Sequence, residues 1–163
     1  MADVGIGPEE FKNTMARVAA TVTVVTTQTP SGPVGLTVSA FTSVSADPQI
    51  VLVCIDKRVG SLQAMLDGDG YTVNLLPEGT DEEAMVFATH GVDRFSAVSW
   101  RAPDTPSAGP VLDIAFGHFE CQTVGRIEMG DHWVIFGKVL AGGRDQSDVP
   151  PLVWLGRGFV KVG

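Results

Sequence analysis

The feature of this 163-residue sequence that most restricts its fold is a succession of short β-branched and apolar segments with few helical patterns between them. Residues 21–27 read Thr-Val-Thr-Val-Val-Thr-Thr, and the turn at 30–33 separates them from Val34–Val38, which predicts a hairpin. Another strand is expected at Ile50–Ile55, apolar on both faces and central in its sheet. Strands that follow one another in this way favour an antiparallel barrel over a doubly wound parallel sheet.

Other segments complete this prediction of a mainly β chain with a few peripheral helices. An amphipathic helix is expected from Pro8 through Ala19, a short helix capped by Ser61 up to Leu66, and a helix opened by a capping box at Thr80–Glu83. We expect a single domain over residues 1–163, with residues 1–10 as an N-terminal extension. Further strands are predicted at Tyr71–Leu75, Ala97–Arg101, Ile114–Val124, His132–Leu140, Leu152–Leu155 and Gly158–Val162.

Composition and missing motifs exclude several classes of function. The net charge of −8 argues against nucleic-acid binding, and the longest apolar stretch is far shorter than the roughly 20 residues that span a bilayer. The two cysteines give no disulfide framework, so a cytoplasmic protein is expected. The three histidines show no metal-ligand spacing, and no Walker, nucleophile-elbow or Rossmann motif occurs, so neither a metal site nor a Rossmann cofactor site is predicted.

The segment from Gly35 to Ser45 is the most informative for function. Five small hydroxyl residues lie in the nine positions 37–45, where a strand is expected to run out into a loop. Hydroxyls and exposed backbone amides in such a segment can hold a polar, planar ligand. An ordinary Thr/Ser-rich edge of a sheet is the alternative, and composition alone leaves both interpretations open.

The order and spacing of several motifs resemble those of the short-chain flavin reductases, the reductase components of two-component flavin-dependent monooxygenases. The resemblance runs from about Phe11 to Val162. It implies a split β-barrel of Greek-key type that forms a homodimer and binds FAD or FMN near the subunit interface. The matching stretches are Gly35–Ser45 with Asp47-Pro48, Tyr71–Leu76, Asp93–Phe95 before Trp100, Gly109–Leu112, Glu120-Cys121, Gly130–His132 and Pro151–Trp154.

The resemblance also implies an activity and a set of site residues. The reaction is hydride transfer from NADH, or less favourably NADPH, to a flavin that then reaches a monooxygenase partner by diffusion. His132 would lie on the nicotinamide side of the pocket. The flavin-binding residues implied are Thr37, Val38, Ser39, Ala40, Ser45, Cys54, Ile55, Asp56, Lys57, Arg58, Ser61, Arg94, Phe95, Trp154 and Phe159, with the phosphate near Lys57, Arg58 and Ser61.

Each of these roles has a structural alternative. Ser61 could serve as a helix cap alone, His132 could serve to close a turn alone, and Trp154 could belong to the core. Lys57 and Arg58 could be solvated loop charges. At the level of the whole protein, a flavin-binding electron carrier and a non-catalytic dimeric barrel both stay open, as do FMN against FAD and the substrate of the oxygenase. The negative net charge favours NADH over NADPH, because a 2′-phosphate needs a nearby cation.

Overall fold

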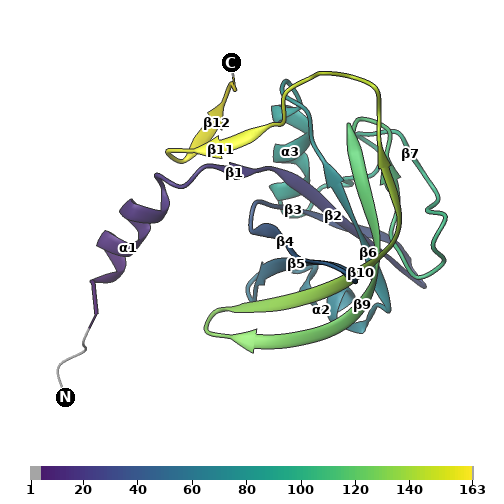
Figure 1. Ribbon diagram of the computed structural model, residues 1–163, viewed down its shortest axis with the longest axis horizontal. Coiled ribbons are helices and arrows are strands. Elements are labelled where there is room, and N and C mark those ends of the chain that lie inside the picture. Colours follow the sequence, from purple (N-terminus) through teal and green to yellow (C-terminus); the bar gives the residue numbers. More distant parts are fainter. Residues whose placement is uncertain (1–4, 163) are drawn as a thin grey trace.

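Seven strands form one antiparallel sheet in the computed structural model, which describes residues 5–162 (Figure 1). Their order across the sheet is β3-β2-β6-β9-β10-β5-β4. The prediction of a mainly β, antiparallel chain is confirmed. The strands are β2 (Thr23–Thr29), β3 (Gly32–Val38), β4 (Phe41–Ala46), β5 (Gln49–Asp56), β6 (Gly70–Leu75), β9 (Gly117–Met129) and β10 (His132–Arg144).

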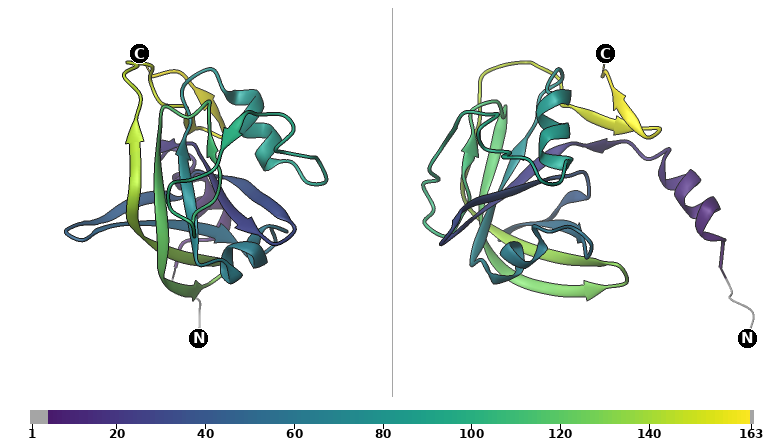
Figure 2. Two further views of the ribbon diagram at one scale, coloured as in Figure 1. Left: turned by 90° about the vertical axis from the view of Figure 1, so that its right-hand side faces the viewer. Right: turned by 180° about the vertical axis from the view of Figure 1, so that it is seen from behind.

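Smaller elements surround this sheet. β1 (Ala20–Thr21), β11 (Val153–Leu155) and β12 (Gly158–Val160) form a three-stranded sheet, while β7 (Trp100–Arg101) pairs with β8 (Val111–Leu112). The helices are α1 (Pro8–Met15), α2 (Leu62–Asp67) and α3 (Asp81–Ala88). The right-hand view of Figure 2 shows α3 beside the β11–β12 hairpin and α1 projecting away from the sheet.

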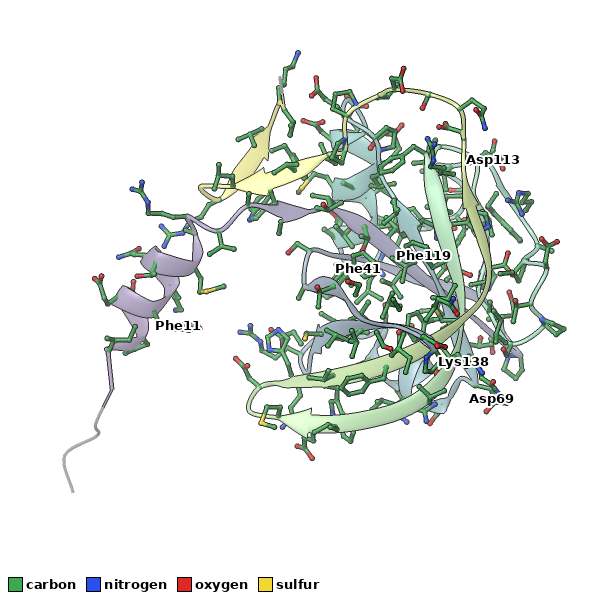
Figure 3. All side chains as sticks on the ribbon, in the orientation of Figure 1. Phe11, Phe41, Asp69, Asp113, Phe119 and Lys138 are labelled. Carbon is green, nitrogen blue, oxygen red and sulfur yellow. The ribbon has the colours of Figure 1, made fainter. Side chains whose placement is uncertain are left out.

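The main sheet is strongly curved around an apolar interior. Phe41 on the edge strand β4 stacks on Phe119 of β9, with ring centroids 6.4 Å apart, although β5 and β10 lie between these strands (Figure 3). Only a curled sheet brings side chains from such distant strands together. No ladder joins β3 to β4 within residues 5–162, so closure into a complete barrel stays a prediction. The buried core members are Val25, Leu36, Val38, Val51, Val53, Ile55, Met65, Tyr71, Val73, Cys121 and Ile135.

A second apolar cluster fixes α3 and the β11–β12 hairpin against the sheet. Phe87 of α3 is fully buried in it and packs edge-to-face on Phe95, with centroids 5.3 Å apart. Gly35 makes this approach possible, because a Cβ there would lie 2.9 Å from a ring carbon of Phe87. The buried members of the cluster are Val22, Val24, Leu76, Ala84, Phe87, Leu112 and Leu152.

On β2, β6 and β9, the face that points away from the main apolar core carries buried polar side chains. These side chains hold the segment 104–112. Asn74 donates to the carbonyls of Val24 (3.1 Å) and Pro110 (3.3 Å) and accepts from the Leu112 amide (2.8 Å). Thr26 also donates to the Pro110 carbonyl, at 2.6 Å. Gly109 lies so close to the Thr26 main chain that an added Cβ would be 2.2 Å from its carbonyl carbon. Backbone on a sheet face needs such partners, since buried peptide groups without hydrogen bonds are costly.

Three sequence predictions about strands are wrong in detail. The hydroxyl-rich segment is not a loop, because Phe41–Ala46 forms the edge strand β4 with a bulge at Val44. The strand predicted as central lies second from that edge, and only Val51, Val53 and Ile55 of its apolar residues are buried. The strand expected at Ala97–Arg101 contains only the two residues of β7, because Trp100 and Arg101 alone pair with β8.

The helix predictions need corrections at their ends. α1 stops at Met15, and none of its residues is buried. Neither Ser61 nor Thr80 caps a helix through its side chain; the Thr80 hydroxyl instead donates to the Pro77 carbonyl at 2.8 Å. Within residues 5–162 no helix is long and apolar enough to cross a membrane, and no group of three or more metal-ligating side chains is present.

Glu120 offers a test of how the segment 104–112 is held. Its fully buried carboxylate accepts hydrogen bonds from the amides of Asp104 (3.1 Å) and Thr105 (2.6 Å). Burial alone would raise the pKa of this carboxyl, but the amide donors outweigh it and the pKa lies below its ordinary value of 4.5. The stability contributed by the carboxylate is therefore present above about pH 4.5 and is lost as pH falls through the lower pKa of the folded state.

We expect Glu120→Gln to lower the free energy of unfolding by about 2–4 kcal/mol near pH 7, because a neutral amide accepts weaker hydrogen bonds than a carboxylate. Urea denaturation at a series of pH values measures this difference, which should shrink once wild-type Glu120 is protonated. The exposed control Glu82→Gln should change stability by less than about 0.5 kcal/mol. A loss that is the same at neutral and strongly acidic pH would contradict the role given to the Glu120 charge.

Candidate functional site

An apolar pocket of about 190 Å³ lies where the end of β3 meets α3 and the β11–β12 hairpin. Four residues predicted for the site from sequence meet here. Thr37 and Ser39 come from the β3 end, and Trp154 and Phe159 come from the hairpin. The remaining wall is formed by Val22, Ala84, Met85 and Ala88.

The main chain between β3 and β4 carries free hydrogen-bond donors beside this pocket. Within residues 5–162, the amides of Ser39 and Ala40 find no acceptor, and the Ser39 hydroxyl makes no hydrogen bond. The Thr37 hydroxyl donates to the Ala84 carbonyl at 2.6 Å, so its proton is committed and its oxygen can only accept from a ligand. A pocket with apolar walls and a few aimed polar groups is typical of a small-molecule site.

Trp154 and Phe159 form the aromatic wall of the pocket. Their rings pack edge-to-face with centroids 5.1 Å apart, and the two residues face each other in the β11–β12 register. The turn between these strands places both Gly156 (φ 63°) and Arg157 (φ 64°) in the left-handed region. Both rings also pack against the second core cluster, so the structural alternative for Trp154 and its site role are compatible.

Ala40 connects the pocket to the strand end predicted to lie beside the flavin. Its carbonyl accepts a hydrogen bond from the Cys54 amide at 2.9 Å. Burial raises the pKa of the half-buried Cys54 thiol, which therefore stays protonated and unreactive at neutral pH. The side chains of Val38 and Ile55 are buried in the core, so only their backbone could face a ligand. Ser45 is half-buried on β4, where it pairs with Ile50.

Two ion pairs and a histidine–aspartate hydrogen bond engage the polar residues at the end of β5 and the turn of β9–β10. His132 is the first residue of β10 and pairs with Asp56 across the sheet, as part of the predicted turn at Gly130. We call this group the hairpin-tip cluster. Its ion pairs are Arg58 with Asp56 (2.5 Å) and Lys57 with Glu128, and a hydrogen bond joins His132 Nδ1 to Asp131 (2.7 Å).

These contacts change the acid–base properties of the carboxylates in the hairpin-tip cluster. Hydrogen bonds from Arg58 hold the pKa of Asp56 well below its usual range, and the hydrogen bond with His132 lowers the pKa of Asp131. Both carboxylates therefore stay charged at neutral pH. Lys57 and Arg58 were predicted to receive the flavin phosphate, and each would have to exchange its carboxylate partner to do so.

Arg94 and Ser61 are brought together, but in a structural arrangement. The Arg94 guanidinium donates to the Thr89 carbonyl (2.8 and 3.2 Å), to the Gly35 carbonyl and to the Ser61 hydroxyl (3.1 Å). It thereby ties the end of α3 to β3 and to the start of α2. Phe95 packs edge-to-face on both Phe87 and Trp100, and together with Arg94 it lines a separate pocket of about 220 Å³.

Sequence reasoning missed the contribution of α3 to the pocket. The capping-box pattern located this helix, yet nothing in the sequence indicates that Ala84, Met85 and Ala88 would cover the β3 end. The one available signal is their spacing, since residues three and four apart share a helix face. Met85 is 50% exposed and forms an open part of the pocket wall.

Comparison with known proteins decides the family. The model of the flavin reductase like domain matches residues 15–163, nearly the whole chain. The chain belongs to this family. The resemblance identified from the sequence motifs is thus confirmed.

Individual relatives of this flavin reductase-like chain include enzymes with stated activities. The "Flavin reductase (NADH)" of Kitasatospora aureofaciens is 36% identical over 94% of this chain and 81% of its own length. The reductase subunit HsaB of a flavin-dependent monooxygenase of Rhodococcus jostii is 28% identical over 96% of this chain and 80% of its own length. Two relatives from Rhizobium meliloti are longer, and the chain spans 60% and 43% of their lengths.

A solved structure has the same fold. The NADH:FAD oxidoreductase SgcE6 of Streptomyces globisporus C-1027, in complex with NAD and FAD fragments, superposes with a TM-score of 0.89 and 29% identity. The match covers 99% of this chain and 98% of the other.

Arg94 provides a test of the site architecture that needs no ligand. We expect Arg94→Ala to lower the free energy of unfolding by about 1.5–3 kcal/mol in flavin-free urea denaturation, because several charge-assisted hydrogen bonds are lost together. Arg126→Ala serves as the control, since Arg126 makes a single hydrogen bond, to the Gly68 carbonyl, and should cost less. Equal stability of the Arg94 variant and the wild type would show that this guanidinium does not hold α3 in place.

Proposed function

We propose that the protein is an NADH-dependent flavin reductase that reduces FAD or FMN and supplies the reduced flavin to a monooxygenase. The observation that carries the proposal is the pairing of an apolar aromatic pocket with the free amides of Ser39 and Ala40. A planar heteroaromatic ring with carbonyl acceptors requires such a combination of surfaces. Family membership supports the same activity, as does the activity stated for the Kitasatospora relative.

The residues around the pocket fit a flavin in their chemistry. Trp154, Phe159 and Met85 offer apolar surface for a ring system, and the Ser39 hydroxyl is available for a polar substituent. Hydride transfer between nicotinamide and flavin is the chemistry that the bound cofactors supply. The role of this chain is to bind the rings in contact and to exclude competing reactions, so no catalytic dyad is required.

The protein groups at the β3–β4 connection would act on charge that develops during reduction. The amides of Ser39 and Ala40 would donate to a flavin carbonyl, where negative charge accumulates as electrons arrive. Their positions are fixed before a ligand binds, because the Cys54 amide holds the Ala40 carbonyl and the Thr37 hydroxyl holds α3. Donors fixed in this way need no reorganisation at the moment of reaction.

The hairpin-tip cluster would face the nicotinamide nucleotide. Asp131 holds Nδ1 of His132, which leaves Nε2 of the 39%-exposed imidazole for a ligand such as the carboxamide. Each cation of the cluster has a carboxylate partner, so a 2′-phosphate of NADPH would find no free cation here. This arrangement supports NADH as the preferred reductant.

The delivery of reduced flavin and the assembly of the protein are further parts of the proposal. The relative HsaB is named as a reductase subunit of a flavin-dependent monooxygenase, and a diffusing reduced flavin would serve such a partner here. We also propose a split barrel that pairs as a homodimer. Support comes from α1, whose apolar residues Phe11 and Met15 are 56% and 48% exposed. The hydrogen bonds that join the end of α1 to the β11–β12 turn leave these apolar side chains uncovered, so a second copy of the chain could pack on them.

A direct test measures NADH oxidation with and without added FMN or FAD. We expect turnover only when flavin is added. Ala88→Phe should raise the flavin KM by about tenfold or more, because the larger side chain enters the pocket at its α3 wall. Ala102→Phe is the matched control, because Ala102 is exposed and does not line the pocket.

The outcomes separate the alternatives. A tightly bound flavin with little NADH oxidation would support an electron carrier, and no flavin binding at all would support a non-catalytic protein. An Ala88→Phe variant with an unchanged flavin KM would place the flavin away from the β3–α3 pocket.

Nucleotide preference is tested by releasing Lys57 from its ion pair. We expect Glu128→Gln to raise kcat/KM for NADPH relative to NADH by about 3–10-fold, since a free ammonium can contact the 2′-phosphate. Glu82→Gln on the exposed face of α3 is the control, because it changes the net charge by the same amount. It should leave this ratio unchanged. A ratio that rises equally in both variants would indicate a general charge effect instead.

A further inference from the structure

A second hollow, of about 270 Å³, lies at the end of the sheet opposite the β9–β10 turn. It shares no lining residue with the β3–α3 pocket. Asp113, which Figure 3 labels near the end of β10, is one of its lining residues. The lining residues are Arg101, Val111, Leu112, Asp113, Ala115, Phe116, Gly117, His118, Gly143, Arg144 and Asp145. We call it the Arg101–Arg144 pocket.

Two unpaired arginines converge on this pocket. Within residues 5–162, neither Arg101 nor Arg144 makes a hydrogen bond through its side chain or an ion pair. By contrast, Lys57, Arg58 and Arg94 are engaged by carboxylates or carbonyls. The lining also includes Asp113 and Asp145, so the feature that favours an anion here is the pair of available guanidinium groups and not a net positive charge.

His118 and bare backbone complete the pocket wall. The imidazole is only 15% exposed, and its Nε2 lies 3.5 Å from the carboxylate of Glu120, which is already occupied by two backbone amides. Gly143 faces open space, since a Cβ added there would have no atom within 4 Å. A ligand can therefore approach the backbone closely at this point.

Two acids line the same pocket and oppose an anion to different degrees. Asp145 accepts hydrogen bonds from the amide (3.0 Å) and hydroxyl (2.6 Å) of Ser147, so its carboxylate is turned to its own loop. Asp113 is exposed, and its side chain makes no hydrogen bond within residues 5–162. Asp113 is thus the acid that most weakens anion binding here.

We infer that the Arg101–Arg144 pocket binds a tetrahedral dianion, either free phosphate or the phosphate group of a small metabolite. Guanidinium groups form paired hydrogen bonds with phosphate oxygens, and two of them on one pocket can hold a dianion from two sides. His118 adds a donor when it is protonated. This inference is independent of the proposed flavin reduction, because it uses none of the residues assigned to that reaction.

Titration of the full-length protein with sodium sulfate tests the inference, with sulfate as a probe that keeps its double charge across the working pH range. We expect saturable NMR shifts at the amides of Gly117 and Gly143. Arg101→Gln and Arg144→Gln should each weaken binding by about tenfold, and Asp113→Asn should tighten it. Lys138→Gln is the matched control. Lys138 lies on β10, the strand of Arg144, but outside the pocket, and it has no ion-pair partner within residues 5–162.

Two further arms sharpen the result. Glycerol 3-phosphate competing with sulfate more strongly than inorganic phosphate would assign the pocket to a phosphate ester rather than the free ion. Burial and Arg101 outweigh the opposing effects of Glu120 and Asp104 and lower the pKa of His118 below its ordinary value. The imidazole therefore gains its second proton in mild acid, where sulfate should bind more tightly. His118→Gln should remove that pH dependence. Shifts that do not saturate, or that are equal in Arg144→Gln and the wild type, would overturn the inference.

Discussion

The buried side chain of Asn74 is the interaction on which the layered structure depends. A single amide bridges the β2 carbonyl of Val24, the Pro110 carbonyl and the Leu112 amide. It thereby fixes an irregular segment on a sheet face that would otherwise expose unpaired polar groups to a dry interior. Because the segment 104–112 covers this face, the sheet can curve around the apolar core on its other face. The same segment contributes Leu112 to the second cluster.

The candidate site depends indirectly on the segment that Asn74 holds, through Leu112 and α3. Leu112 and Leu152 pack in the cluster that positions α3, and α3 supplies one wall of the β3–α3 pocket. Beside the pocket, the hydrogen bond between the Cys54 amide and the Ala40 carbonyl joins the β3–β4 connection to β5, the strand that ends at Asp56 of the hairpin-tip cluster. The free amides and the aromatic wall are thus held by parts of the chain that are far apart in sequence, and neither wall could be moved without disturbing a core.

Local patterns explain which parts of the fold were predictable. The β-branched run in β2 and the turn at Gly130 are encoded by neighbouring residues, and both were found from sequence. β4 escaped prediction because an exposed edge strand of serines and threonines carries no apolar alternation. Within the hairpin-tip cluster, the Lys57–Glu128 pair joins residues far apart in sequence, and it depends on the register that places His132 opposite Asp56, which no local pattern specifies. Similarly, the role of Arg94 depends on carbonyls from two separate elements.

The helix α1 is attached to the turn that carries the aromatic wall of the pocket. The Gly156 amide donates to the Ala16 carbonyl at 2.7 Å, and Arg157 donates to the Asn13 side chain at 2.8 Å. The helix is therefore fastened to the very turn that carries Trp154 and Phe159 on its two strands. Any contact that restrains α1 from outside also restrains the orientation of these two rings. In the proposed homodimer, a partner subunit that contacts α1 would therefore also act on the β11–β12 turn, which carries one wall of the pocket.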